Sequence, residues 1–277
     1  MNIITANVGQ GALAIVRHQG EAILVDSRVP PSDDATVAHV KELLAVSLKD
    51  HYVKGLILTG FDEDHTEVVG VSIVLRKYRP DWIMYPKYYK DSDEAKRVFA
   101  LIKAEEKARS TSGSPLKKVS VRLDQLTNRN LRDLSNHFDF ELFSPHIEDM
   151  DSSNNCSIVL LLTGRGDRGF SYLITGDTEN PRWDTINRLF GKALKSHVLA
   201  APHHGSKNAT HPASLLQIEP HTVLISAGVD NQYGHPHPQA LKVYKQVAKR
   251  VFSTNMNGGV SLLTQPGATE LTTTLVP

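Results

Sequence analysis

The chain is poor in cysteine, because its 277 residues include one, Cys156. A single cysteine excludes an intramolecular disulfide and any zinc module built from several cysteines. The sequence also lacks an uncharged apolar run of about 18 residues, and it does not begin with the basic and apolar stretch of a secretory signal. These absences predict a cytoplasmic protein without a membrane segment.

The chain also lacks an excess of charge of either sign. The 31 lysine and arginine residues face 30 aspartate and glutamate residues, which leaves a net charge of +1. A chain with this balance is not a typical polyanion binder as a whole. Residues 87–122 depart from it, with ten basic residues against five acidic ones. Such a stretch is usually a solvated helix face, although it could also flank a cleft for phosphate groups.

Short strand-like segments alternate with helix-like segments along the chain. Strands are predicted at 3–8, 13–17, 22–26, 55–58, 82–85, 119–123, 138–143, 157–162, 171–175, 198–201, 222–226, 251–254, 259–264 and 269–275. Helices are predicted at 33–48, 68–78, 92–109, 182–189 and 238–249, and a flexible linker at 110–115. We expect the first three strands to pair in antiparallel fashion. Two strand-rich halves with helices predict an α/β fold of two packed sheets, covered by helices, in one domain of residues 1–277.

Aspartate and histidine residues follow several of the predicted strands. The sequence Thr-Gly-Phe-Asp-Glu-Asp-His, residues 59–65, comes directly after the strand 55–58, and similar residues follow later strands. Aspartate and histidine are ligands that hold hard or borderline divalent ions. Candidate ligands for one or two ions are Asp62, Asp64, His65, Asp177, His203 and His204.

Six segments, in the same order, resemble the metallo-β-lactamase superfamily and within it the hydrolase domain of ComEC-like competence proteins. They are residues 7–11 (Asn-Val-Gly-Gln-Gly), 23–26 (Ile-Leu-Val-Asp), 60–65, 154–157 (Asn-Asn-Cys-Ser), 174–177 (Ile-Thr-Gly-Asp) and 202–206 (Pro-His-His-Gly-Ser). The resemblance implies a four-layer αββα sandwich, in which two mixed sheets are flanked by helices. It also implies a metal-dependent hydrolase.

The metal loop departs from the family pattern His-x-His-x-Asp-His. Gly60 stands at the first histidine and has no ligand atom, whereas Asp62, at the second, could still coordinate. The resemblance implies one well-formed site made by Asp64, His65, a bridging Asp177 and one histidine of the pair 203–204, with His203 favoured over His204. The second site would be weaker. The donor set favours manganese or zinc, with magnesium as a further candidate.

The resemblance implies a phosphodiesterase or nuclease that acts on DNA through a metal-activated water. Asp64, Asp62 or Glu63 would orient this water or accept its proton, and His235 would protonate the leaving oxygen or contact a phosphate. Asp26 would orient a ligand from behind. The expected substrate is a nucleic acid or nucleotide, and a protein partner in a larger bacterial system is a further expectation.

Two other functions stay open at the level of sequence. The first is hydrolysis of an ester, lactone or thioester, although the branches with these activities generally keep the full histidine loop. The second is a binding or scaffold module whose metal site has decayed, which the residues at positions 60 and 62 favour. The acidic residues also have simpler interpretations, since Asp62 and Asp64 could cap a helix and Asp177 could belong to a turn.

Overall fold

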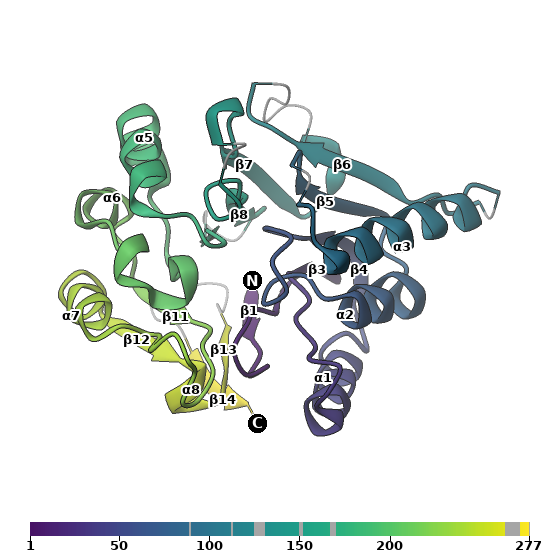
Figure 1. Cartoon of the computed structure of the whole chain (residues 1–277), viewed down its shortest axis with the longest axis horizontal. Helices are drawn as coiled ribbons and strands as arrows, with labels where there is room; N and C mark the ends of the chain where they lie inside the picture. The colour runs from purple at the N-terminus through teal and green to yellow at the C-terminus, as the bar shows by residue number, and fades with distance from the viewer. Residues whose placement is uncertain are drawn as a thin grey trace.

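The computed structural model describes residues 1–88, 90–111, 113–124, 131–149, 152–166, 170–263 and 272–276. Two mixed β-sheets lie face to face, and helices cover their outer faces (Figure 1). The eight-stranded sheet has the order β14-β13-β1-β2-β3-β4-β5-β6, and the six-stranded sheet has the order β12-β11-β10-β9-β8-β7. The predicted four-layer αββα sandwich is therefore confirmed.

The strands and helices are short, as expected for packed layers. The first sheet contains β1 (Asn2–Thr5), β2 (Ala14–His18), β3 (Glu21–Val25), β4 (Tyr52–Ile57), β5 (Trp82–Pro86), β6 (Lys117–Val121), β13 (Gly259–Leu263) and β14 (Thr272–Val276). The second contains β7 (Phe138–Ser144), β8 (Val159–Gly164), β9 (Ser171–Ile174), β10 (Val198–Ala200), β11 (Thr222–Ile225) and β12 (Arg250–Ser253). The α-helices are α1 (Asp34–Ser47), α2 (Val68–Ile73), α3 (Asp93–Arg109), α5 (Asn180–Phe190), α6 (Pro212–Ile218), α7 (Pro238–Val247) and α8 (Thr254–Asn257).

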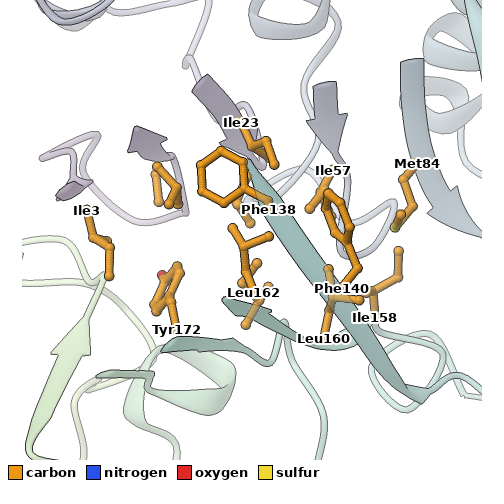
Figure 2. Close-up of a cluster of buried hydrophobic side chains, with 14 of the residues drawn as sticks. Ile3, Ile23, Ile57, Met84, Phe138, Phe140, Ile158, Leu160, Leu162 and Tyr172 are labelled. Carbon is orange, nitrogen blue, oxygen red and sulfur yellow. The ribbon is translucent and has the colours of Figure 1, made fainter. Parts of the chain in front are cut away.

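Three hydrophobic clusters account for the four layers. One lies between the sheets, where Ile23 and Ile57 of the first sheet face Phe138, Phe140 and Leu160 of the second (Figure 2). The second cluster joins the first sheet to α1, α2 and α3, and the third joins the second sheet to α5, α6 and α7. Strands that are buried on both faces need apolar residues at every position, which explains the continuous apolar runs of β3 and β8.

Parallel strands bring several loops to one edge of the sandwich. In the first sheet β3 pairs in parallel with β4, and in the second sheet β9, β10 and β11 are parallel neighbours. The carboxyl ends of parallel neighbours meet at the same edge of a sheet, where α/β proteins commonly bind ligands. The loops after three of these strands, β4, β9 and β10, contain the predicted metal ligands. Sheet topology therefore places residues that are far apart in sequence next to one another.

One glycine allows a close approach between helix and sheet beside this edge. A Cβ atom on Gly70 of α2 would lie 1.9 Å from the carbonyl oxygen of Ser27, the residue after Asp26. Only glycine fits at this distance, because the neighbouring atom belongs to rigid backbone. Gly70 thus fixes α2 against the end of β3.

The observed elements differ from the predicted ones in several places. The first strand ends at Thr5, whereas we predicted an end at Val8, and the short helices α6 and α8 were not predicted. Residues 264 and 269–271 of the two predicted C-terminal strands lie outside the described residues. The antiparallel pairing of β1, β2 and β3 is confirmed.

The segment after α3 is tied to the fold, in contrast to the flexible linker predicted at 110–115. The buried side chain of Arg109 donates hydrogen bonds to the carbonyl oxygens of Ser114 and Pro80, each at 2.8 Å. Residue 112 lies outside the described residues. A serine- and glycine-rich composition predicts flexibility, but it does not reveal a buried arginine that binds the backbone from the preceding helix.

Within the part of the chain that the structure describes, every helix is too short or too polar to cross a bilayer.

Candidate metal centre

Four polar side chains from three strand ends meet at the edge described above. Ligand atoms of Asp64, His65, Asp177 and His204 all lie within 4.8 Å of one another. Asp64 and His65 belong to the loop after β4, Asp177 follows β9, and His204 follows β10. Asp64 is partly exposed, whereas the other three are buried. We call this group the four-residue cluster, and all of its members belong to the predicted ligand set.

His65 is held from behind by Asp26, which follows β3. The Nδ1 atom of His65 lies 2.8 Å from Asp26 Oδ2, and its Nε2 atom lies 2.7 Å from Asp177 Oδ1. Asp26 Oδ1 also accepts hydrogen bonds from the backbone N–H and the hydroxyl of Thr59, at 2.7 and 2.9 Å. A carboxylate on the rear nitrogen fixes the orientation of a histidine ring. These contacts support the orienting role predicted for Asp26.

His204 is positioned by the backbone. Its Nδ1 atom donates a hydrogen bond of 2.7 Å to the carbonyl oxygen of Ser226, after β11. Its Nε2 atom lies 3.3 Å from Asp64 Oδ2 and 3.7 Å from Asp177 Oδ1, yet among the described residues this buried atom has no hydrogen-bond partner. An unsatisfied buried polar atom costs about 1–3 kcal/mol. A metal ion in the cluster would supply the missing partner.

Backbone strain accompanies these side chains. His203, His204 and Asp26 all adopt the left-handed region, with φ angles of 47°, 53° and 57°. Residues other than glycine rarely adopt this conformation, and those that do gather at functional sites. The surrounding sheet therefore holds three site residues in a conformation that the isolated chain would avoid.

The carboxylates and imidazoles of the four-residue cluster stabilise each other's charges. Burial by itself would raise the pKa of Asp177, but the charges of His65 and His204 outweigh it and hold this pKa well below its usual range. Burial by itself would lower the pKa values of His65 and His204, but the negative charge of Asp177 raises both above their ordinary value. Protons and metal ions compete for the same ring nitrogens. A divalent ion can thus replace the protons on the His65 and His204 rings, which the negative carboxylates stabilise.

The donor set fits a divalent cation on two grounds. Two carboxylates and two imidazoles form the mixed oxygen and nitrogen set that suits zinc and manganese. In addition, the unpaired Nε2 atom of His204 points into the cluster. The identity of the metal and the number of ions stay predictions.

The metal loop places Asp62 outside the four-residue cluster. One carboxylate oxygen of Asp62 forms an ion pair with the ammonium group of Lys90, and the other accepts a hydrogen bond from the hydroxyl of Ser153. Both oxygens of this predicted ligand therefore have partners within the protein. Gly60 offers no side-chain atom, and its carbonyl oxygen accepts a hydrogen bond of 2.6 Å from the hydroxyl of Thr66.

The structure separates the two neighbouring histidines. His204 belongs to the four-residue cluster, whereas Nε2 of His203 lies 3.8 Å from Asp177 Oδ2, on the opposite side of that carboxylate. The Nδ1 atom of His203 lies 3.4 Å from Glu179 Oε1. The sequence favoured His203 as the ligand, but the geometry favours His204. The strained turn after β10 decides which ring points to which side of Asp177.

A cleft of about 750 Å³ opens above the cluster. Asp64, Asp177 and His204 line it. Its walls include Arg28, Lys90, Asn154, Asn231, Tyr233 and His235. The volume is within the range of sites that bind small organic ligands, and the polar walls suit a charged ligand.

His235 lies in this cleft as predicted, with its ring centroid 5.6 Å from that of His203. Partial burial, followed by the positive charges of His203 and His204, lowers the pKa of His235 to about 4. Its imidazole is therefore neutral at pH 7. A neutral ring can donate a hydrogen bond from one nitrogen, but it is a poor proton donor to a leaving oxygen.

The basic stretch 87–122 contributes little free positive charge to the cleft. Lys96 pairs with Asp91, Lys118 with Glu106, and Arg122 with Asp124. Three of the ten basic residues thus form surface ion pairs, as in the solvated interpretation of the sequence. Lys90 differs from them because it lines the cleft. Burial lowers the pKa of Lys90, and the negative charge of Asp177 acts in the opposite direction.

The sequence analysis missed several residues of the site. Lys90 entered it as one of ten basic residues, and nothing in the local pattern distinguishes it from the others. Arg28 lies two residues after Asp26, lines the cleft and donates a hydrogen bond of 3.1 Å from Nη1 to the carbonyl oxygen of Glu63. No periodicity or motif signals these contacts, because they join segments that lie far apart in sequence.

Metal addition should stabilise the protein if the four-residue cluster binds it. Chelator-treated protein that receives Mn²⁺ at about 100 times its dissociation constant should gain about 2.7 kcal/mol. For a chain of this size the melting temperature should then rise by about 5–10 °C. Differential scanning fluorimetry of the wild type beside Asp64→Ala measures this shift. An equal shift in both proteins would locate the metal elsewhere.

Comparison of the sequence with known proteins finds one relative. No protein-family model matches the chain. ComE operon protein 3 of Bacillus subtilis strain 168 is 32% identical over 206 residues, which are 74% of this chain and 24% of that protein. The chain thus matches about a quarter of the length of this relative.

Two solved structures share the overall architecture. Igni18, described as a novel metallo hydrolase from Ignicoccus hospitalis, superimposes over the whole of both chains with a TM-score of 0.51 and 14% identity. A variant of the CmlA β-hydroxylase also has a TM-score of 0.51, with 13% identity, over 95% of this chain and 54% of its own. At these identities the likeness concerns the fold alone. This chain has the metallo-β-lactamase fold and is related by sequence to the ComEC-like branch of that superfamily.

Proposed function

We propose that this protein is a metal-dependent hydrolase that cleaves phosphodiester bonds, with DNA as its substrate. The observation that carries the proposal is the buried four-residue cluster at the floor of an open cleft. Two cationic side chains, those of Arg28 and Lys90, line the same cleft. A divalent ion beside such groups attracts a phosphate, whose negative oxygens need positive charge during hydrolysis.

Each residue of the cluster has a distinct part in this proposal. When bound, the metal ion would act as a Lewis acid and make water a better nucleophile at neutral pH. Asp26 holds His65 toward the ion, and the carbonyl oxygen of Ser226 does the same for His204. Asp64 is the partly exposed carboxylate of the four, so it can accept a proton from water that enters the cleft.

The walls of the cleft suit a nucleic-acid substrate. The Nε atom of Arg28 is buried and has no hydrogen-bond partner in the described part of the chain, and its Nη1 donates to the carbonyl oxygen of Glu63 at 3.1 Å. Tyr233 is 57% exposed at the cleft and stacks on His235, with ring centroids 6.0 Å apart. Exposed aromatic rings are a common platform on which nucleobases stack. His235 would contact a phosphate as a neutral hydrogen-bond donor.

The fold alone does not decide the reaction. One of the two structures with the same architecture is described as a hydrolase and the other as a hydroxylase. The sequence relative supports the hydrolase proposal, because the match at 32% identity extends over 74% of this chain. It extends over 24% of the relative. The substrate therefore rests on the chemistry of the cleft. A protein partner in a larger bacterial system stays a prediction.

Cleavage assays on purified protein with Mn²⁺ test the proposal. Single-stranded and double-stranded DNA should be nicked by the wild type, and Asp64→Ala should be slower by about a thousandfold. RNA and a cyclic nucleotide, offered in parallel, define the preferred phosphodiester. Faster hydrolysis of a lactone or thioester than of any phosphodiester would contradict the proposal and favour the ester function. An inert wild type without bound metal would favour a binding module.

A further inference from the structure

The two oxygens of Asp177 have different neighbours. Oδ1 lies 2.7 Å from His65 Nε2, inside the four-residue cluster. Oδ2 is on the side of His203, 3.8 Å from its Nε2 atom, and Glu179 lies beyond this ring, 3.4 Å from Nδ1. Asp62 lines the cleft as well. Outside the four-residue cluster the cleft is thus lined by Asp62 and His203, and the carboxylates of Asp62 and Asp177 favour a cation beside them.

Lys90 supplies a cation at this place. Its ammonium group forms an ion pair with Asp62, whose other oxygen accepts a hydrogen bond from Ser153. The side chains of Lys90 and Asp62 are 28% and 27% exposed, so the pair is shielded but open to the cleft. An ammonium group has three donors. Asp62 is the acceptor for one of them, and among the described residues the other two are open to a ligand.

Lack of space does not explain the absence of a ligand side chain at residue 60. A Cβ atom on Gly60 would meet one neighbour within 4 Å, the hydroxyl of Ser157 at 3.9 Å. The backbone at this residue has no positive φ angle that would require glycine. A side chain can therefore begin at residue 60 without strain. The residues present do not fit a second ion, because Asp62 is already neutralised and Gly60 offers no donor.

We infer that the ammonium group of Lys90 takes the place of a second metal ion, so that the protein binds one divalent ion and holds an anionic substrate oxygen with Lys90. The inference rests on the proposed function, because it needs an ion in the four-residue cluster. At a given distance, an ammonium group repels a divalent ion twice as strongly as it repels a univalent ion. Lysine also binds phosphate as a compact point charge.

Metal stoichiometry tests the inference without any activity assay. Mn²⁺ binding is measured by equilibrium dialysis and by electron paramagnetic resonance, on folded proteins checked by circular dichroism. The wild type and Gly60→His should bind one equivalent and give the six-line signal of an isolated ion. The double variant Gly60→His/Lys90→Ala should bind two equivalents, and coupling between the ions should weaken this signal.

Matched variants separate charge from packing. Gly60→His/Lys90→Arg keeps the positive charge and should still bind one equivalent. Lys96→Ala removes a neighbouring lysine that pairs with Asp91 outside the cleft, and it should bind one equivalent as well. With a small phosphodiester as substrate, Lys90→Ala should raise KM about tenfold, whereas Lys96→Ala should leave KM unchanged.

The outcomes distinguish this inference from the proposed function. Two equivalents in the wild type, or one equivalent in Gly60→His/Lys90→Ala, would overturn the role of Lys90 and leave the hydrolase proposal intact. A wild type that binds no Mn²⁺ would overturn both. If the metal binds but no phosphodiester is cleaved, the proposed substrate fails, and the stoichiometry of the variants still decides whether Lys90 replaces an ion.

Discussion

Asp177→Ala should lose both the bound metal and the hydrolase activity. Asp177 places one oxygen 2.7 Å from His65 and lies 3.7 Å from His204, so its carboxylate joins the two histidines of the four-residue cluster. Without it the site keeps one carboxylate and lacks the charge that raises the pKa values of the two rings. We expect a fall in DNA cleavage of at least about a thousandfold, which corresponds to about 4 kcal/mol of transition-state stabilisation.

Metal content by mass spectrometry and initial rates of DNA nicking measure this effect on the same samples. Asp177→Asn keeps the shape of the side chain and should fail in the same way, because an amide is a weak ligand. Asp184→Ala is the matched control, since Asp184 is an exposed carboxylate that pairs with His211. Full activity in Asp177→Asn would contradict the assignment of the metal centre.

Asp26→Ala should weaken the metal centre from behind and also destabilise the fold. Asp26 binds His65 Nδ1 and accepts hydrogen bonds from both the N–H and the hydroxyl of Thr59, all in a buried environment. Its removal leaves buried donors without partners, which costs about 1–3 kcal/mol for each unsatisfied group. Loss of an orienting carboxylate typically reduces metal affinity about 10- to 100-fold.

Two measurements separate these effects. Urea unfolding in the presence of a chelator gives the free energy of unfolding of the metal-free protein, and calorimetric titration gives the affinity for Mn²⁺. Asp26→Asn should keep most of the stability, because asparagine tolerates the left-handed backbone at this residue and retains one acceptor oxygen. An Asp26→Ala protein with wild-type affinity for Mn²⁺ would show that His65 is oriented by other contacts.

The local chemistry of the site was readable in the sequence. Asp64, His65, Asp177 and His204 were identified as candidate ligands because aspartate and histidine follow apolar strand segments, and the structure brings these four together. Alternation and helical spacing also predicted most strands and helices, because their signals depend on neighbouring residues. Short elements could not be predicted in this way. Helix α6 has seven residues, too few for a clear period, and it begins at Pro212 with His211 as its N-cap.

The sequence by itself thus determined the layered fold and the types of ligand, since both follow from local patterns of apolar and polar residues. The tertiary structure decided which side chains contact one another at the site. It placed His204 rather than His203 beside Asp64, and it joined Asp62 to Lys90 and Ser153. These choices depend on parallel strand order, on backbone at positive φ and on the meeting of loops from distant segments. None of them leaves a periodic trace in the chain, so physical contact alone reveals them.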